Sequence, residues 1–257
     1  MNKKVIFFDI DGTILNHQNK IPASTKEAVK RLKEEGHHVA IATGRAPFMF
    51  KHIREELGID SFVSYNGQYV VFEGQTIYEN PLITTTIESL LPDADEAGHP
   101  LIFMGDGKMM STVAEHPYIK ESLQSLGFTP PAVDREFFRN HPIYQILLFC
   151  KDHEEKQYKC YDDLQFIRWH EFSVDIIPAG GSKAEGIKRL IERLNISRED
   201  VYAFGDGPND YEMISYAGTG VAMGNAVPKL KELADFITKP VDEDGILYGL
   251  EQLKLLK

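Results

Sequence analysis

Two aspartates stand two positions apart directly after an apolar run near the start of the chain. Asp9 and Asp11 follow Val5–Phe8, and Gly12 and Thr13 come after them. Because side chains alternate along an extended strand, residues two apart point the same way. Close carboxylates repel unless a cation lies between them, and Mg²⁺ is a hard cation that prefers oxygen ligands. The pair therefore predicts a magnesium site or, more simply, a turn in which Asp9 caps a backbone amide.

A second acidic group follows another apolar run in the last third of the chain. Val201–Phe204 is typical of a buried strand, and Asp206 comes shortly after it. Pro208 suits the first turn of a helix, where it would hold Asn209 and Asp210 rigid. A capping turn needs one aspartate rather than a cluster. We therefore expect these residues to extend the hard-metal site that the first pair begins.

Two other places have the chemistry to bind an anion. Thr43 and Gly44 end a predicted strand, where a hydroxyl and backbone N–H groups at a helix start can bind one. The dipeptide Thr-Gly is also common in ordinary turns between a strand and a helix. Ser182 and Glu185 form a capping box that places Lys183 in the first helical turn. The helix dipole disfavours a cation there unless an anion binds beside it, and the alternative is a solvated surface lysine.

Strands alternating with helices at both ends of the chain must position these residues. The predicted strands of these parts cover residues 3–8, 38–42, 62–65, 201–204, 220–223 and 236–238. This order predicts an α/β fold with a doubly wound, Rossmann-like parallel sheet covered on both faces. The carboxyl ends of such strands are where open α/β sheets bind ligands. Asn66-Gly67 lies at one of these ends, but on its own the dipeptide predicts a turn.

The middle of the chain has a different pattern. Predicted strands follow one another without an intervening helix at 101–104 and 109–113, and again at 166–169 and 172–177. Such pairs are typical of an antiparallel α+β unit. We therefore predict a core domain made of residues 1–83 and 179–257, with an inserted α+β domain at residues 84–178.

Composition excludes several classes of partner. The 257 residues contain 28 Lys and Arg against 39 Asp and Glu, a net charge of −11, which argues against nucleic-acid polymers and anionic membranes. The longest apolar stretches are too short to span a bilayer or to form a signal peptide. Cys150 and Cys160 are the two cysteines, a number that fits a reducing compartment. We expect a cytoplasmic protein with a small ligand.

The four blocks, in this order, resemble the haloacid-dehalogenase-like (HAD) phosphohydrolases, and the match is close to their Cof-like branch (class IIB). That branch carries a large α/β cap domain between its second and third motifs, where this chain has its predicted insert. The resemblance spans nearly the whole sequence. The four blocks are Asp9-Ile10-Asp11-Gly12-Thr13, Thr43-Gly44-Arg45, Lys183 and Gly205-Asp206-Gly207-Pro208-Asn209-Asp210. The resemblance continues through Glu212-Met213 and the stretch from Ala217 to Ala226 to Asp244-Gly245.

The resemblance implies a Mg²⁺-dependent phosphatase that hydrolyses small phosphorylated metabolites through an aspartyl-phosphate. Asp9 would be the nucleophile, and Asp11 would be the general acid and base. The implied metal site consists of Asp9, the backbone carbonyl of Asp11, and Asp206, with Gly207 and Asp210 close by. The implied phosphate cradle consists of the backbone near Ile10 and Gly44, the Thr43 hydroxyl, Lys183 and Asn209.

Two other functions stay open beside the phosphatase. A phosphotransferase or phosphomutase on the same scaffold would pass the phosphoryl group to an acceptor other than water. A non-catalytic phosphoacceptor module is the third hypothesis, and Asp11 argues against it because such a module gains nothing from an acid and base beside the nucleophile. Sugar phosphates, nucleotides and cofactor phosphates fit the resemblance equally, and the oligomeric state is open.

Overall fold

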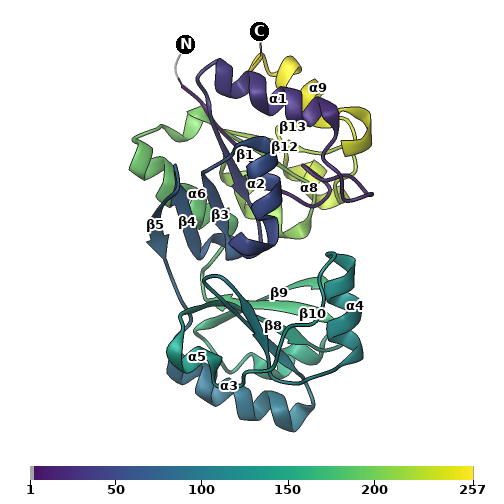
Figure 1. The fold of residues 1–257 in the computed structure, drawn as a ribbon. Helices are drawn as coiled ribbons and strands as arrows, with labels where there is room; N and C mark the ends of the chain where they lie inside the picture. The colour runs from purple at the N-terminus through teal and green to yellow at the C-terminus, as the bar shows by residue number, and fades with distance from the viewer. Residues whose placement is uncertain (1–2, 257) are drawn as a thin grey trace. The chain divides into compact units, whose positions relative to one another are not determined.

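The computed structural model describes residues 3–256, which form two compact units (Figure 1). The core unit contains residues 3–45, 49–78 and 182–256. The inserted unit contains residues 46–48 and 79–181. In residues 3–256, no helix is both long enough and apolar enough to cross a membrane.

An eight-stranded sheet forms the centre of the core unit, in the order β13-β12-β11-β1-β2-β3-β4-β5. Neighbouring strands from β13 to β3 pair in parallel, and β4 is antiparallel to β3. The strands are β1 (Val5–Phe8), β2 (His38–Ala42), β3 (Phe62–Ser64), β4 (Tyr69–Phe72), β5 (Gln75–Glu79), β11 (Val201–Gly205), β12 (Thr219–Ala222) and β13 (Phe236–Ile237). The predicted parallel α/β class is confirmed.

Two groups of helices pack with this sheet. The first is α1 (Ala23–Glu34), α2 (Lys51–Leu57) and α9 (Gly245–Gln252), in which α1 contacts both of the others. The second is α6 (Lys183–Leu194), α7 (Tyr211–Tyr216) and α8 (Pro228–Leu233), in which α7 contacts both of the others. All four side chains of β1 are fully buried, as expected for a central strand with both faces covered.

The inserted unit is an antiparallel α+β structure. Its five-stranded sheet has the order β7-β6-β8-β10-β9, and each neighbouring pair is antiparallel. One face of the sheet shares an apolar core with residues of α3 and α5. The elements are α3 (Thr84–Ala97), β6 (Leu101–Gly105), β7 (Met109–Ser111), α4 (Pro117–Ser125), α5 (Phe137–Asn140), β8 (Ile143–Phe149), β9 (Leu164–His170) and β10 (Ser173–Pro178).

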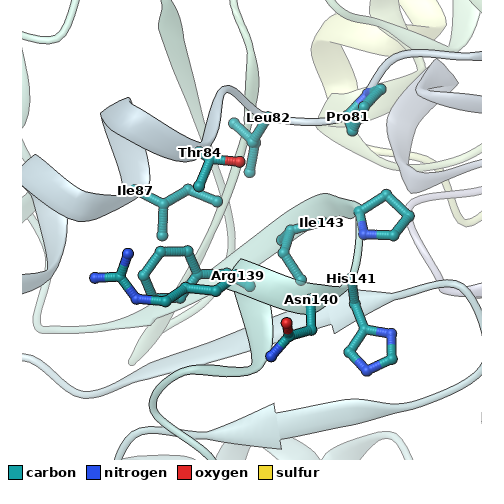
Figure 2. A pocket seen from close by; sticks show the side chains of 10 residues that line it. Pro81, Leu82, Thr84, Ile87, Arg139, Asn140, His141 and Ile143 are labelled. Carbon is teal, nitrogen blue, oxygen red and sulfur yellow. The ribbon is translucent and has the colours of Figure 1, made fainter.

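A pocket of about 360 Å³ opens in the inserted unit between the start of α3 and the connection from α5 to β8 (Figure 2). Apolar side chains such as Ile87 and Ile143 line it beside the polar Asn140 and His141. Arg139 also lines it, but its guanidinium is ion-paired with Glu88 and with Glu136, so its charge is already offset. Of the residues that the structure describes, none that the sequence predicted for the site lines this pocket.

Candidate active site

Three neighbouring strands end at the same level in the core unit. Phe8 of β1 is paired with Ile41 of β2 on one side and with Phe204 of β11 on the other. Since all three strands are parallel, the loops that follow them leave the sheet at one edge. The predicted acidic and anion-binding residues of these loops are thereby brought together.

Lys183 lies at the centre of the site. Its side chain is fully buried, and its Nζ donates to Asp9 Oδ1 at 2.6 Å and to Asp210 Oδ1 at 2.7 Å. The Ser182 Oγ accepts from the Glu185 N–H at 3.3 Å, so the predicted cap does begin α6 at Lys183. The alternative of a solvated surface lysine is wrong, because two carboxylates offset this cation.

The charges of this cluster perturb one another strongly. Burial raises the pKa of Asp9 well above its ordinary value, although the Lys183 ammonium opposes the shift. Burial, followed by the charge of Asp210, raises the pKa of Asp206 to about 7. Burial alone would lower the pKa of Lys183, but Asp210 and Asp9 outweigh it and raise that pKa. The site thus holds more negative charge than its lysine can offset.

Asp210 uses both of its oxygens within the protein. Oδ1 accepts from Lys183, and Oδ2 accepts from the backbone N–H groups of Asp206 at 2.9 Å and of Gly207 at 3.0 Å. This carboxylate therefore fixes the loop after β11 against the lysine. Asn209 lies half-buried in the same 3₁₀ turn, Pro208–Asp210, with its Oδ1 close to Gly207.

The carboxylates have the arrangement of a divalent-cation site. One oxygen from each of Asp9, Asp206 and Asp210 lies within 4.8 Å of the others. Three carboxylates facing one ammonium leave an excess of negative charge that a hard divalent cation would offset. Gly12, at φ +73°, passes so close to the Asp206 carboxylate that a Cβ would overlap it, so only glycine fits there. The residues present therefore fit a divalent metal.

Arg45 forms a bidentate salt bridge with Asp11, the second aspartate of the pair. Its Nε donates to Asp11 Oδ2 at 2.9 Å and its Nη2 to Asp11 Oδ1 at 2.6 Å. The arginine side chain is 7% exposed, whereas that of Asp11 is 48% exposed. Arg45 belongs to the motif Thr43-Gly44-Arg45, but the sequence alone predicts no role for its side chain. Its position directly after Thr43-Gly44, at the end of a predicted strand, is the sequence feature that could have indicated a place in the site.

Thr43 and Gly44, which the sequence predicts to form an anion seat, lie in the loop that follows β2. Thr43 is buried, and its Oγ1 accepts from the Arg45 N–H at 3.1 Å, an arrangement that leaves the hydroxyl proton for another acceptor. The side-chain amide of Asn66 lies against Gly44. The segment Tyr65–Gly67 is a turn, as predicted, but Asn66 within it is fully buried. Ile10 places its side chain in the core.

Asn225 is a further residue that sequence reasoning did not assign to the site. Its Nδ2 donates to the Gly12 carbonyl at 2.8 Å and lies 3.4 Å from Asp206 Oδ2. Its Oδ1 accepts from the Val241 N–H at 2.9 Å. One amide thus ties the loops after β1 and β11 to the segment before α9.

A family model of the haloacid dehalogenase-like hydrolases matches residues 6–250, which is nearly the whole chain. The chain belongs to this family. The matched residues of this HAD hydrolase include all the strand ends and side chains of the site described above.

Related proteins show how far the similarity of this HAD hydrolase extends. A Bacillus subtilis (strain 168) protein with the provisional name phosphatase YkrA is 58% identical over 257 residues, covering 100% of both chains. A hypothetical protein from Geobacillus kaustophilus HTA426 superposes with a TM-score of 0.93 at 57% identity, covering 99% of this chain and 100% of that one. The HAD subclass IIB sugar phosphatase BT4131 superposes with a TM-score of 0.89 at 29% identity, covering 99% and 100%. The predicted resemblance to class IIB is confirmed.

Proposed function

We propose that this hydrolase is a magnesium-dependent phosphatase that cleaves phosphate monoesters of small metabolites through an aspartyl-phosphate on Asp9. The observation that carries the proposal is the buried pairing of Asp9 with Lys183 beside Asp206, at the edge where three parallel strands end. Relatives with phosphatase names support the reaction class.

Mg²⁺ would be held by Asp9, Asp206 and the backbone carbonyl of Asp11, with Gly207 and Asp210 adjacent. When bound, the ion would neutralise charge on the phosphoryl oxygens during transfer. The side chains of the site would then only need to supply an attacking oxygen, proton transfer and orientation.

The chain's own residues account for both halves of the reaction. A carboxylate oxygen of Asp9 attacks phosphorus while the bond to the leaving oxygen breaks, and Asp11 donates a proton to that oxygen. In the second half, Asp11 takes a proton from a water that attacks the aspartyl-phosphate, which regenerates Asp9 and releases inorganic phosphate. Lys183 favours the ionised form of Asp9 and orients its carboxylate before the attack.

The phosphate cradle would combine the Thr43 hydroxyl, the backbone amides of Ile10 and Gly44, Lys183 and Asn209. The inserted domain, predicted at residues 84–178, would act as the cap that shields the phosphoenzyme and selects the leaving group. One relative, 29% identical, is named 5-amino-6-(5-phospho-D-ribitylamino)uracil phosphatase and another is named a sugar phosphatase. We therefore propose sugar phosphates, nucleotides and cofactor phosphates as the substrate classes.

The deciding experiment is a phosphatase screen over a panel of phosphorylated metabolites with Mg²⁺, ranked by kcat/KM. Release of inorganic phosphate without an added acceptor supports the phosphatase. Transfer of the phosphoryl group only when an acceptor sugar is present would instead support a phosphotransferase or phosphomutase.

Metal binding is expected to strengthen as the pH rises from about 5.5 to about 7. The pKa of Asp206 is raised from 3.8 to about 7, so below that pH a proton must leave before the carboxylate can bind a cation. One displaced proton changes the affinity by about tenfold per pH unit. Calorimetric titration of the protein with Mg²⁺ measures this dependence. Asp206→Asn should bind more weakly and with a smaller slope, and a pH-independent affinity of the wild type would contradict the assignment.

Arg45→Gln is expected to lower kcat/KM for alkyl phosphates at least about tenfold more than for p-nitrophenyl phosphate. Arg45 fixes the Asp11 carboxylate, and an alkoxide needs the proton that Asp11 supplies, whereas p-nitrophenolate leaves without one. The parameter kcat/KM reports on steps up to the cleavage of the ester bond. Asp11→Asn should show the same selectivity, and the double variant should lose little more than either single one. Equal losses on both substrates would contradict this role.

A further inference from the structure

The turn Tyr65–Gly67, directly after β3, has an unusual backbone. Tyr65 and Asn66 have φ values of 52° and 51°, so two consecutive non-glycine residues are left-handed. L-residues avoid this region, bulky ones above all. Both side chains are nevertheless buried, at 0% and 1% exposure, where an ordinary surface turn would leave them in solvent. Contacts with the surrounding structure must therefore hold this conformation.

One set of these contacts joins the turn to the loop after β2. The Tyr65 N–H donates to the Arg45 carbonyl at 3.3 Å, and the Asn66 N–H donates to the Thr43 carbonyl at 3.1 Å. The two bonds flank Gly44. A Cβ on Gly44 would lie 3.0 Å from Asn66 Nδ2 and 3.1 Å from Asn66 Oδ1. The side-chain amide of Asn66 therefore packs against Gly44, the second residue of the anion seat.

The other set joins the same turn to the helix that carries the lysine. Gly67, at φ +100°, lies so close to the Ser182 carbonyl that a Cβ there would overlap it. On the next turn of α6, a Cβ on Gly186 would lie 3.0 Å from the Gly67 Cα. The turn is thus packed between the Thr43–Arg45 loop and the start of the Lys183 helix, the two groups that we assign to phosphate binding.

We propose that Asn66 is a positioning residue of the anion seat formed by Thr43 and Gly44. Its amide, which lies against Gly44, restricts the backbone of the loop that carries the Thr43 hydroxyl. Glycine has the most backbone freedom of any residue, so a seat built on it needs an external support. The left-handed backbone of the turn is what brings that amide to Gly44. The inference rests on the proposed phosphatase function.

Asn66→Gly tests the role of the amide with little disturbance of the backbone. Glycine adopts a φ near 51° without strain, so the turn should keep its conformation while it loses the side chain. The KM for p-nitrophenyl phosphate and the inhibition constant of inorganic phosphate are expected to rise about tenfold, because a small misplacement of a binding group has a large effect. The melting temperature is expected to stay within about 4 °C of the wild type. Asn66→Asp keeps the shape but adds a negative charge, so phosphate should bind more weakly still.

Asn195 offers a matched control. It ends α6 with φ 50° and ψ 43°, nearly the same conformation as Asn66 at φ 51° and ψ 38°, but it is exposed to solvent. Asn195→Gly therefore makes the same chemical change in the same backbone conformation away from the seat. Its KM and phosphate inhibition constant are expected to equal those of the wild type.

The outcomes separate this inference from the function on which it rests. An active wild type together with an Asn66→Gly variant of unchanged phosphate affinity would overturn the positioning role alone. So would an Asn66→Gly variant that unfolds at a much lower temperature and loses kcat without a rise in the inhibition constant, because that is a purely structural effect. A wild-type chain that neither hydrolyses p-nitrophenyl phosphate nor binds phosphate would overturn the phosphatase proposal and this inference with it.

Discussion

Asp9→Asn is expected to lower kcat for p-nitrophenyl phosphate by about 10⁴-fold or more, because removing a nucleophile removes the covalent route itself. An amide oxygen is a poor nucleophile toward phosphorus, and asparagine cannot carry the phosphoryl group as an acyl phosphate. Steady-state release of p-nitrophenolate in the presence of Mg²⁺ measures the loss. Retained turnover in the purified variant would contradict the nucleophile assignment.

The same substitution is expected to leave the fold intact. Burial raises the pKa of Asp9, which shows that its charged form is held in the site at a free-energy cost. Asparagine has the same shape without that charge, and Lys183 keeps its bond to Asp210. The midpoint of thermal unfolding without metal should therefore be equal to or higher than that of the wild type. Asp60→Asn, at an exposed position of the core unit, is the matched control for activity and should retain it.

The part of the site that the sequence could predict is the part encoded by strand ends. An apolar run followed by Asp9 and Asp11 predicts a buried strand with two carboxylates at its end, and β1 confirms that strand. The parallel pairing of β1 with β11 then brings Asp206 to the same edge whatever lies between them in the chain. The capping residue Ser182 places Lys183 in the same local manner.

The parts that the sequence could not predict depend on side chains that meet only after the chain has packed. The bidentate salt bridge between Arg45 and Asp11 joins residues that are 34 positions apart in the sequence. Asn66-Gly67 has the same local pattern as an exposed turn, and its burial follows from the packing of α6 against Gly67. Likewise, the helix whose first turn Pro208 is expected to form begins as the 3₁₀ turn Pro208–Asp210, where Asp210 Oδ2 accepts from two backbone N–H groups of its own loop.

Lys183→Ala is expected to destabilise the metal-free protein by about 3–5 kcal/mol at neutral pH, in addition to weakening phosphate binding. The substitution leaves the buried carboxylates of Asp9 and Asp210 without their cation, and uncompensated buried charge is among the largest single effects on stability. Denaturant unfolding at several pH values measures it. Lys188→Ala is the control in the same helix. Lys188 is half-buried, pairs with Glu185 and lies over the Tyr216 ring, but no buried carboxylate depends on its charge, so the substitution should change stability by less than about 1 kcal/mol.

The pH dependence of this loss has a definite sign. Without Lys183, the effect that opposes the raised pKa of Asp9 is gone, so that pKa rises further above its unfolded value of 3.8. A carboxyl whose pKa is raised by folding binds its proton more tightly in the folded state, and its contribution to stability is lost as the pH rises through that pKa. The difference in unfolding free energy between wild type and Lys183→Ala should therefore widen as the pH rises above the unfolded pKa of the carboxyl. Added Mg²⁺ should narrow it, since a bound cation offsets the same carboxylates. A gap that is absent, or that shrinks as the pH rises, would show that Lys183 does not balance these charges.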